Sequence, residues 1–212
     1  MVAGFAQSAP NATLMRFAAA ERRAGARALD VGCGAARNAL PLAVSGWRVI
    51  GTDLSWPMLS AAAARSDSRP PSGRLSFVLA PMERLPIHDR SMDLIVAHGI
   101  WNLARSAVQF RAAVREAARV ARAGAALFVF TFSRTTLPPE APPVPGEPFV
   151  FTQFSGEPQC FLTDAQLVAE LEAAGFRPDP AVPLTEHNVP PPGAIRTGGP
   201  PVIYEGVFRR SL

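Results

Sequence analysis

One stretch decides the fold: Ala28-Leu-Asp-Val-Gly-Cys-Gly-Ala-Ala-Arg-Asn38. A short apolar run ends in two glycines, Gly32 and Gly34, and the apolar spacing of a helix follows at once. This order predicts a buried strand, a tight turn and the start of a helix. Glycine lets the backbone bend sharply and lets a ligand come close. The first turn of a helix offers unpaired N–H groups to the same place.

A second apolar strand follows, Trp47-Arg-Val-Ile-Gly-Thr52, and it ends at Asp53. An acid at the tip of the second strand is placed to accept hydrogen bonds from a ribose diol. Dinucleotide-binding enzymes need a third glycine in the first turn, and Arg37 occupies that position, so their fingerprint fails. The carboxylate of Asp30 favours another ligand. S-adenosylmethionine (SAM) carries an ammonium and a sulfonium, which a nearby carboxylate attracts, whereas it would repel a pyrophosphate.

The acid-x-Gly-x-Gly pattern that starts at Asp30, with Asp53 after the second strand, resembles motifs I and II of the SAM-dependent methyltransferases with the doubly wound fold. A longer match, Gly-Cys-Gly-x-x-Arg-Asn-x-Leu-x-Leu-Ala followed by Gly46, resembles the tellurite-resistance and thiopurine-type small-molecule methyltransferases. Ala36 stands where many of these enzymes have a third glycine. The resemblance covers residues 27–133, and the rest in outline.

The resemblance implies a single domain over residues 1–212, built as a three-layer α/β/α sandwich. Its sheet is doubly wound and mostly parallel, with seven strands, an antiparallel last strand and helices on both faces. The apolar periodicity places the elements along the chain. We expect strands at 27–31, 48–52, 75–80, 94–97, 125–132, 181–185 and 202–209, and helices at 36–45, 57–66, 107–122 and 164–174.

Two further segments are candidates for covering a bound ligand. An amphipathic helix at about 11–24 either covers the pocket, as in the resembled enzymes, or packs on the edge of the sheet. A proline-rich segment at about 133–160 is unusually long for a loop in a compact domain. Because it includes the apolar run Phe149-Val-Phe-Thr-Gln-Phe154, we interpret it as an ordered flap over the substrate.

Ligands of open α/β sheets bind at the carboxyl ends of the strands, which locates the candidate site residues. For the cofactor they are Asp30, Gly32, Gly34, Arg37, Asp53, Leu54, Met82, Glu83 and His98. His98 follows the fourth strand and is also the candidate general base, although a histidine without a catalytic role fits the sequence equally well. For the substrate they are Trp101, Arg134 and His187, and core packing is the competing interpretation of Trp101.

Composition excludes several other classes of protein. The two cysteines form no C-x-x-C pair, and the three histidines are too far apart in the sequence for a metal site, so no metal is expected. The net charge of +4 comes from scattered arginines without interleaved aromatic residues, which argues against nucleic acid as a partner. No apolar run approaches the length of a membrane span, and no signal peptide is recognised, so we expect a cytoplasmic protein.

The sequence therefore predicts SAM-dependent methyl transfer to a small molecule, with S-adenosylhomocysteine (SAH) as the product. A sulfonium methyl group is already a good electrophile, so the enzyme mainly has to align the acceptor and exclude water. The expected acceptor is a thiol or a chalcogen species, and a phenol or a carboxylate is the alternative. A nucleic-acid or protein methyltransferase, a SAM-binding protein without catalysis and a nicotinamide oxidoreductase are the rival hypotheses. Whether the protein is a monomer or a homodimer stays open.

Overall fold

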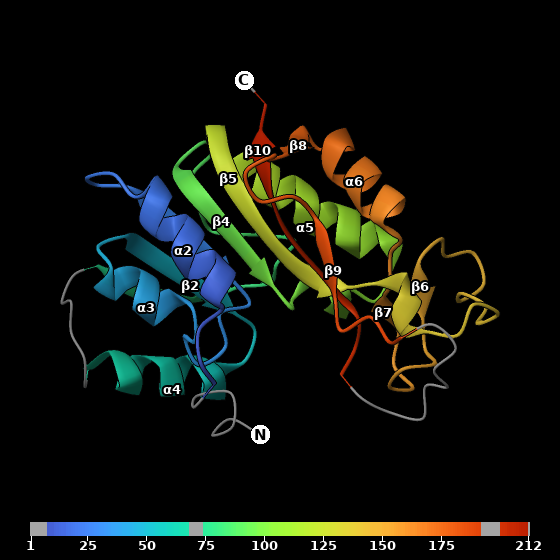
Figure 1. Ribbon diagram of the computed structural model, residues 1–212. Coiled ribbons are helices and arrows are strands. Elements are labelled where there is room, and N and C mark those ends of the chain that lie inside the picture. Colours follow the sequence, from blue (N-terminus) through green and yellow to red (C-terminus); the bar gives the residue numbers. More distant parts are fainter. Residues whose placement is uncertain (1–7, 68–73, 192–199, 212) are drawn as a thin grey trace.

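The computed structural model describes residues 8–67, 74–191 and 200–211 and is built on one twisted sheet (Figure 1). The strand order is β3-β2-β1-β4-β5-β10-β8, and β9 also pairs with β10. The bounds of these strands are β1 (Arg27–Val31), β2 (Arg48–Asp53), β3 (Leu75–Leu79), β4 (Met92–His98), β5 (Ala121–Phe132), β8 (Phe176–Pro178), β9 (Thr185–His187) and β10 (Ile203–Arg210).

The order of the strands reverses at β1, which pairs in parallel with both β2 and β4. The strand β10 is antiparallel to β5, as expected for the last strand. Within the described residues the sheet has eight strands where seven were expected, because β8 and β9 both pair with β10. The predicted fold class, a doubly wound α/β sheet, is confirmed.

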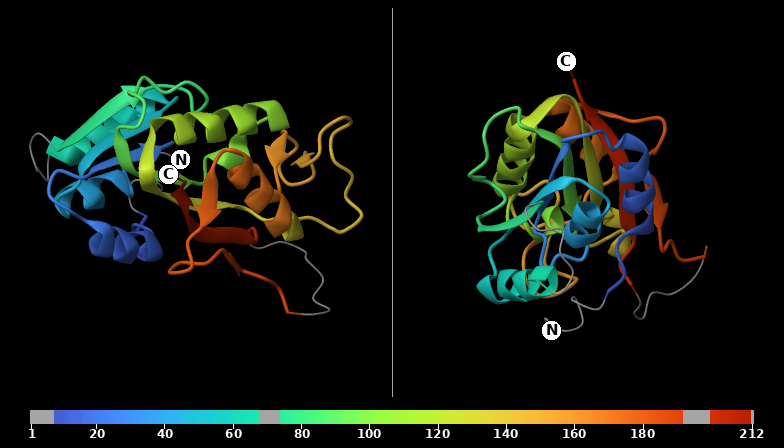
Figure 2. Two further views of the ribbon diagram at one scale, coloured as in Figure 1. Left: turned by 90° about the horizontal axis from the view of Figure 1, so that it is seen from above. Right: turned by 90° about the vertical axis from the view of Figure 1, so that its left-hand side faces the viewer.

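Helices cover both faces of the sheet (Figures 1 and 2). One face packs against α2 (Ala12–Glu21), α3 (Ala39–Val44) and α4 (Trp56–Asp67). The other packs against α5 (Ala107–Val120) and α6 (Asp164–Ala173). Burial of apolar side chains on both faces explains why the strands β1 and β4 are almost continuously apolar.

Several predicted boundaries differ from the structure, and three of the differences have a clear local reason. The helix expected from residue 36 begins at Ala39, because the turn continues through Ala36, whose φ of 61° is left-handed. The strand expected from residue 125 begins at Ala121, directly after α5, and pairs with Met92. The strand expected at 181–185 is replaced by two short strands: β8 precedes this range, and β9 begins at its last residue, Thr185.

The proline-rich segment 133–160 packs on the domain through its own short elements. These are the 3₁₀ helix η2 (Arg134–Thr136) and the hairpin of β6 (Val150–Phe151) with β7 (Gln159–Cys160). The buried rings of Phe149, Phe151 and Phe161 anchor the segment. Another 3₁₀ helix, η1 (Trp101–Leu103), follows β4.

Two further expectations concern the N-terminal helix and the extent of the domain. The predicted N-terminal helix is present as α2, and the side chain of Asn11 caps it by accepting a hydrogen bond from the backbone N–H of Leu14. The expected domain also includes residues 1–7, 68–73, 192–199 and 212, which lie outside the described residues. Among the residues that the structure describes, no helix is long and apolar enough to cross a membrane.

Candidate functional site

A cavity of about 520 Å³ lies at the carboxyl ends of β1, β2 and β4. It sits where the strand order reverses, which is the place where open α/β sheets bind their ligands. It is lined by Asp30, Gly32, Cys33, Gly34, Ala35, Arg37, Asn38, Asp53, Leu54, Ser55, Met58, Ala80, Met82, Glu83, His98, Gly99, Ile100, Leu103 and Gln109. All nine residues predicted to bind the cofactor are in this set.

The turn after β1 is held in shape by steric fit and by Asp53. Gly32 has a φ of 68°, and a Cβ atom there would lie 2.6 Å from the side chain of Ile100, so only glycine fits. The backbone N–H of Gly34 donates to Oδ2 of Asp53 over 2.9 Å, and the N–H of Ser55 donates to Oδ1 over 2.8 Å. Each carboxylate oxygen keeps a further lone pair for a ligand.

Asp30 is a buried acid at the floor of the cavity. It is 2% exposed, and among the described residues its Oδ2 atom has no hydrogen-bond partner. Burial raises the pKa of this carboxyl group to about 7, although Arg37 and the backbone N–H of Ala39 both lower it. An unpartnered carboxylate oxygen in a cavity wall suits a cationic ligand group, because such a group would offset the cost of burying the charge. The site therefore fits the ammonium of SAM.

His98 and Arg37 form a pair in the wall of the cavity. A guanidinium nitrogen of Arg37 lies 2.8 Å from Nδ1 and 3.1 Å from Nε2 of His98. The imidazole ring stacks on Phe130 with 4.0 Å between ring centroids. Burial and the charge of Arg37 lower the pKa of His98 to about 3. His98 is therefore neutral near pH 7. Arginine can only donate hydrogen bonds, so a ring nitrogen of His98 accepts from Arg37.

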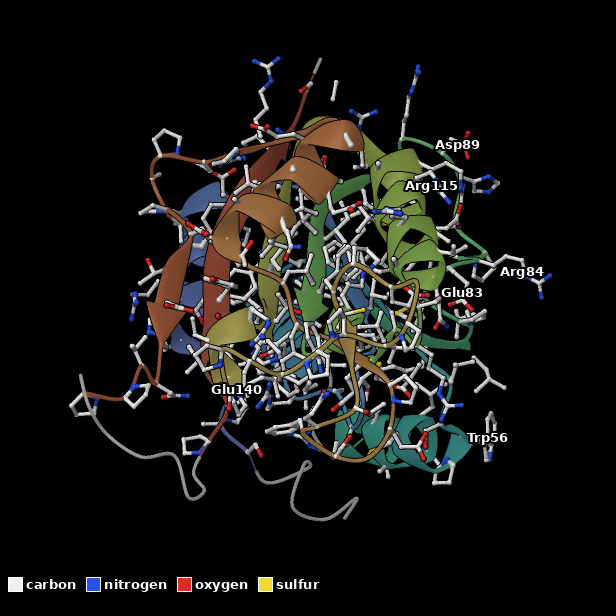
Figure 3. The ribbon with its side chains drawn as sticks, turned by 90° about the vertical axis from the view of Figure 1, so that its right-hand side faces the viewer. Trp56, Glu83, Arg84, Asp89, Arg115 and Glu140 are labelled. Carbon is white, nitrogen blue, oxygen red and sulfur yellow. The ribbon has the colours of Figure 1, made fainter. Side chains whose placement is uncertain are left out.

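The far end of the cavity is more apolar. Leu54 is 68% exposed, and Met82 is buried in the turn after β3. Glu83 accepts a hydrogen bond from Gln109 at Oε1, while its Oε2 atom is buried and has no partner in the described chain. Figure 3 shows Glu83 beside the end of α5 and Arg84 pointing away from the molecule. Glu83 is thus a second acid with an oxygen available to a ligand.

The three residues predicted for the substrate do not line this cavity. Trp101 is 1% exposed and packs edge-on against Phe110, as the alternative interpretation held. The guanidinium of Arg134 donates to four backbone carbonyls at positions 137, 138, 139 and 141. His187 lies on β9 beside a separate depression. Their predicted role in substrate binding remains a prediction.

Both cysteines contact neighbouring residues in the structure. Cys33 packs against Gly51 and Cys160 donates to the carbonyl of Ala104, and burial raises the pKa of both thiols. The described residues contain no group of three or more His, Cys, Asp or Glu side chains that could hold a metal ion. Trp56, the first residue of α4, is 68% exposed and points away from the molecule (Figure 3).

Sequence reasoning overlooked two asparagines at the site. Asn38 is 4% exposed and lines the cavity, and its Oδ1 atom accepts a hydrogen bond from the backbone N–H of Asn11. The side chain of Asn11 also lies 3.4 Å from Nε2 of His98. Asn38 ends the stretch quoted at the start of the sequence analysis, so its place at the cavity could have been predicted from that motif. The contacts of Asn11 depend on how α2 packs, which the local pattern does not contain.

Comparison with known proteins agrees with this geometry. Residues 28–124 match the family model of a methyltransferase domain. The chain is 30% identical over 166 residues to the demethylmenaquinone methyltransferase of Mycolicibacterium vanbaalenii, covering 71% of this chain and 68% of the relative.

Solved structures show the same fold. A SAM-dependent methyltransferase from Methanosarcina mazei has a TM-score of 0.72 at 20% identity, covering 97% of this chain and all of the other. The 1,6-didemethyltoxoflavin-N1-methyltransferase of Burkholderia thailandensis, crystallised with its substrate and SAH, has a TM-score of 0.68 at 19% identity, covering 93% and 78%. At these identities the likeness concerns the fold alone.

Proposed function

This chain belongs to the SAM-dependent methyltransferases, and we propose that it methylates a small-molecule acceptor that reacts as an anion. The observation that carries the proposal is the pairing of Arg37 with a neutral His98 at one wall of the cavity. The guanidinium of Arg37 supplies a fixed positive charge, and the imidazole beside it is uncharged. This charge favours a negatively charged group at this wall.

The rest of the cavity supports one orientation for SAM. Asp53 would accept hydrogen bonds from the ribose hydroxyls, and Asp30 would face the ammonium. Leu54 and Met82 would flank the adenine ring, and Glu83 is the acid available to its amino group. The resembled enzymes often have an acid at the position of Pro81, and Glu83 takes over that role in this proposal. When bound, SAM supplies a methyl group on a sulfonium centre.

Arg37 and His98 would then meet the acceptor. The guanidinium of Arg37 would stabilise the ionised acceptor and hold it in line with the methyl group. The neutral ring of His98 would donate its N–H to the acceptor or receive the acceptor's proton. With a pKa of about 3, the ring is a weak base in the unliganded cavity. It therefore becomes an effective base only if the acceptor draws Arg37 away from it.

Two classes of acceptor meet this requirement. A thiol or chalcogen species ionises easily, with a cysteine-like pKa of about 8.5, and the motif resemblance favours it. A phenol-type or quinol-type acceptor is the second candidate, because the relative from Mycolicibacterium vanbaalenii is named as a demethylmenaquinone methyltransferase. Both react through an electron-rich centre that Arg37 can stabilise as an anion.

The test is a screen for SAH release over thiols, selenium and tellurium oxyanions, phenols, quinols, amines and carboxylates. We expect turnover with at least one acceptor that ionises, and a rate that rises with pH. Arg37→Gln should raise the acceptor KM and move the rise to higher pH, while Arg84→Gln, which alters an exposed arginine, should leave both unchanged. Turnover confined to amines, or an unchanged pH profile in Arg37→Gln, would contradict the proposal.

A further inference from the structure

Glu205 is a buried acid on the face of the sheet that α2 covers. It lies on β10 and is 8% exposed. The pairing register places it directly across from Phe130 of β5, and Phe130 lies across from His98 of β4. Three neighbouring strands thus carry His98, Phe130 and Glu205 in one row, with the imidazole stacked on the phenyl ring between them.

Asn11 bridges the two ends of this row. Its Nδ2 atom donates to Oε2 of Glu205 over 2.6 Å and lies 3.4 Å from Nε2 of His98. Its Oδ1 atom is already used to cap α2, so the amide orientation is fixed by its neighbours. Its backbone N–H donates to Asn38 in the cavity wall. One residue therefore joins the N-terminal helix, the cavity wall, β4 and β10.

Fold stability alone gives a poor reason for Glu205. Burying a carboxylate is costly, and an apolar side chain at such a position is often at least as stable. The short contact to Asn11 is a charge-assisted hydrogen bond, which fixes direction as well as adding energy. Another neighbour with a titratable group is His187, whose Nε2 atom lies 3.8 Å from Oε1 of Glu205.

We propose that Glu205 is a positioning residue for methyl transfer: through Asn11 it holds the ring of His98 over Phe130 and fixes the first turn of α2 against Asn38. Glu205 itself does not line the cavity. Its effect therefore reaches the acceptor only through the ring of His98. That last link rests on the proposed function, whereas the placement of the ring can be measured without any acceptor.

The experiment compares Glu205→Leu, which removes the hydrogen-bond acceptor, with Glu205→Gln, which keeps an oxygen for Asn11. Asn11→Ser is the matched second variant, because serine still caps α2 but cannot donate to Glu205 and His98 together. Each full-length variant is saturated with SAH, whose affinity is measured by calorimetry. The ring ¹⁵N spectrum then reports the tautomer and order of His98. The chain has three histidines, so His98→Gln identifies its signals.

We expect one sharp neutral tautomer of His98 in the wild type and in Glu205→Gln. Glu205→Leu and Asn11→Ser should give broadened or doubled His98 signals, with SAH affinity within about threefold of wild type. With an acceptor from the screen, their turnover should fall roughly 10–10²-fold, the scale for a small misplacement at a reacting centre. Unchanged His98 signals in both variants would overturn the proposal, as would equal effects of Gln and Leu at position 205. Loss of SAH affinity would show a structural role instead.

If Glu205→Leu fails to fold, Asn11→Ser decides the question, since it leaves β10 intact. A failed acceptor screen would leave these spectra unchanged. The proposal for Glu205 and the proposed function can therefore fail separately.

Discussion

At the scale of single residues, two titratable groups at the cavity carry opposite pKa shifts. Burial raises the pKa of Asp30 from 3.8 to about 7, so its folded form binds protons more tightly than the unfolded chain does. Its contribution to stability is therefore lost as pH rises from about 4 to 7. Burial and Arg37 lower the pKa of His98 from 6.5 to about 3, so its contribution is lost as pH falls from 6.5 towards 3.

We predict that these two slopes largely cancel in the wild type between pH 4 and 6.5. Asp30→Asn should unmask His98 and make stability rise with pH across this window. His98→Gln should unmask Asp30 and make stability fall with pH across the same window. Urea unfolding at a series of pH values measures both, and parallel curves for the two variants would show that neither group titrates as described.

Asp30 should also make cofactor affinity depend on pH. The ammonium of SAM favours the ionised carboxylate, so the affinity for SAM should rise as pH passes about 7 and then level off. Asp30→Asn should bind SAM more weakly and without that rise. Calorimetry at pH 6 and pH 8 separates the two behaviours.

At the scale of elements, one side chain organises the first part of the proline-rich segment. Arg134 holds the backbone carbonyls at 137, 138, 139 and 141 and lies over the ring of Phe151 at 4.7 Å. We predict that Arg134→Met speeds hydrogen exchange at 137–147 and raises the acceptor KM, while SAH affinity stays near wild type. Equal loss of SAH affinity and acceptor affinity would indicate that the segment supports the whole fold and does not act as a flap.

The elements also show where sequence patterns suffice. Both ends of the strand β1 were predicted correctly, because a short apolar run followed by glycine rarely adopts another structure. The capping box of α6, at Thr163 and Gln166, marks that helix with equal clarity. By contrast, β8 and β9 are three residues each and form only by pairing with β10. Such pairing depends on tertiary context, which local propensity does not include.

At the scale of the whole molecule, the residues predicted for the cofactor line one cavity, and those predicted for the substrate do not line it. The former sit at fixed offsets from the glycine turn, so one motif locates Asp30, Arg37 and Asp53 together. The contacts of His187 and Asn11 are set by packing between segments far apart in the sequence. Those of Arg134 depend on the path of the irregular backbone at 137–141. Trp101 shows the same limit, since an aromatic residue after a strand fits a binding site and a core equally well.

The most direct test of the account is calorimetry of SAH binding to wild type and to Asp53→Ala, with folding checked by circular dichroism. We predict micromolar-range or tighter binding to the wild type, no binding of NAD, and a loss of about 1–3 kcal/mol in Asp53→Ala, the scale for leaving buried hydrogen-bonding groups unmet. A folded Asp53→Ala protein with unchanged SAH affinity would contradict the claim that SAM binds in this cavity.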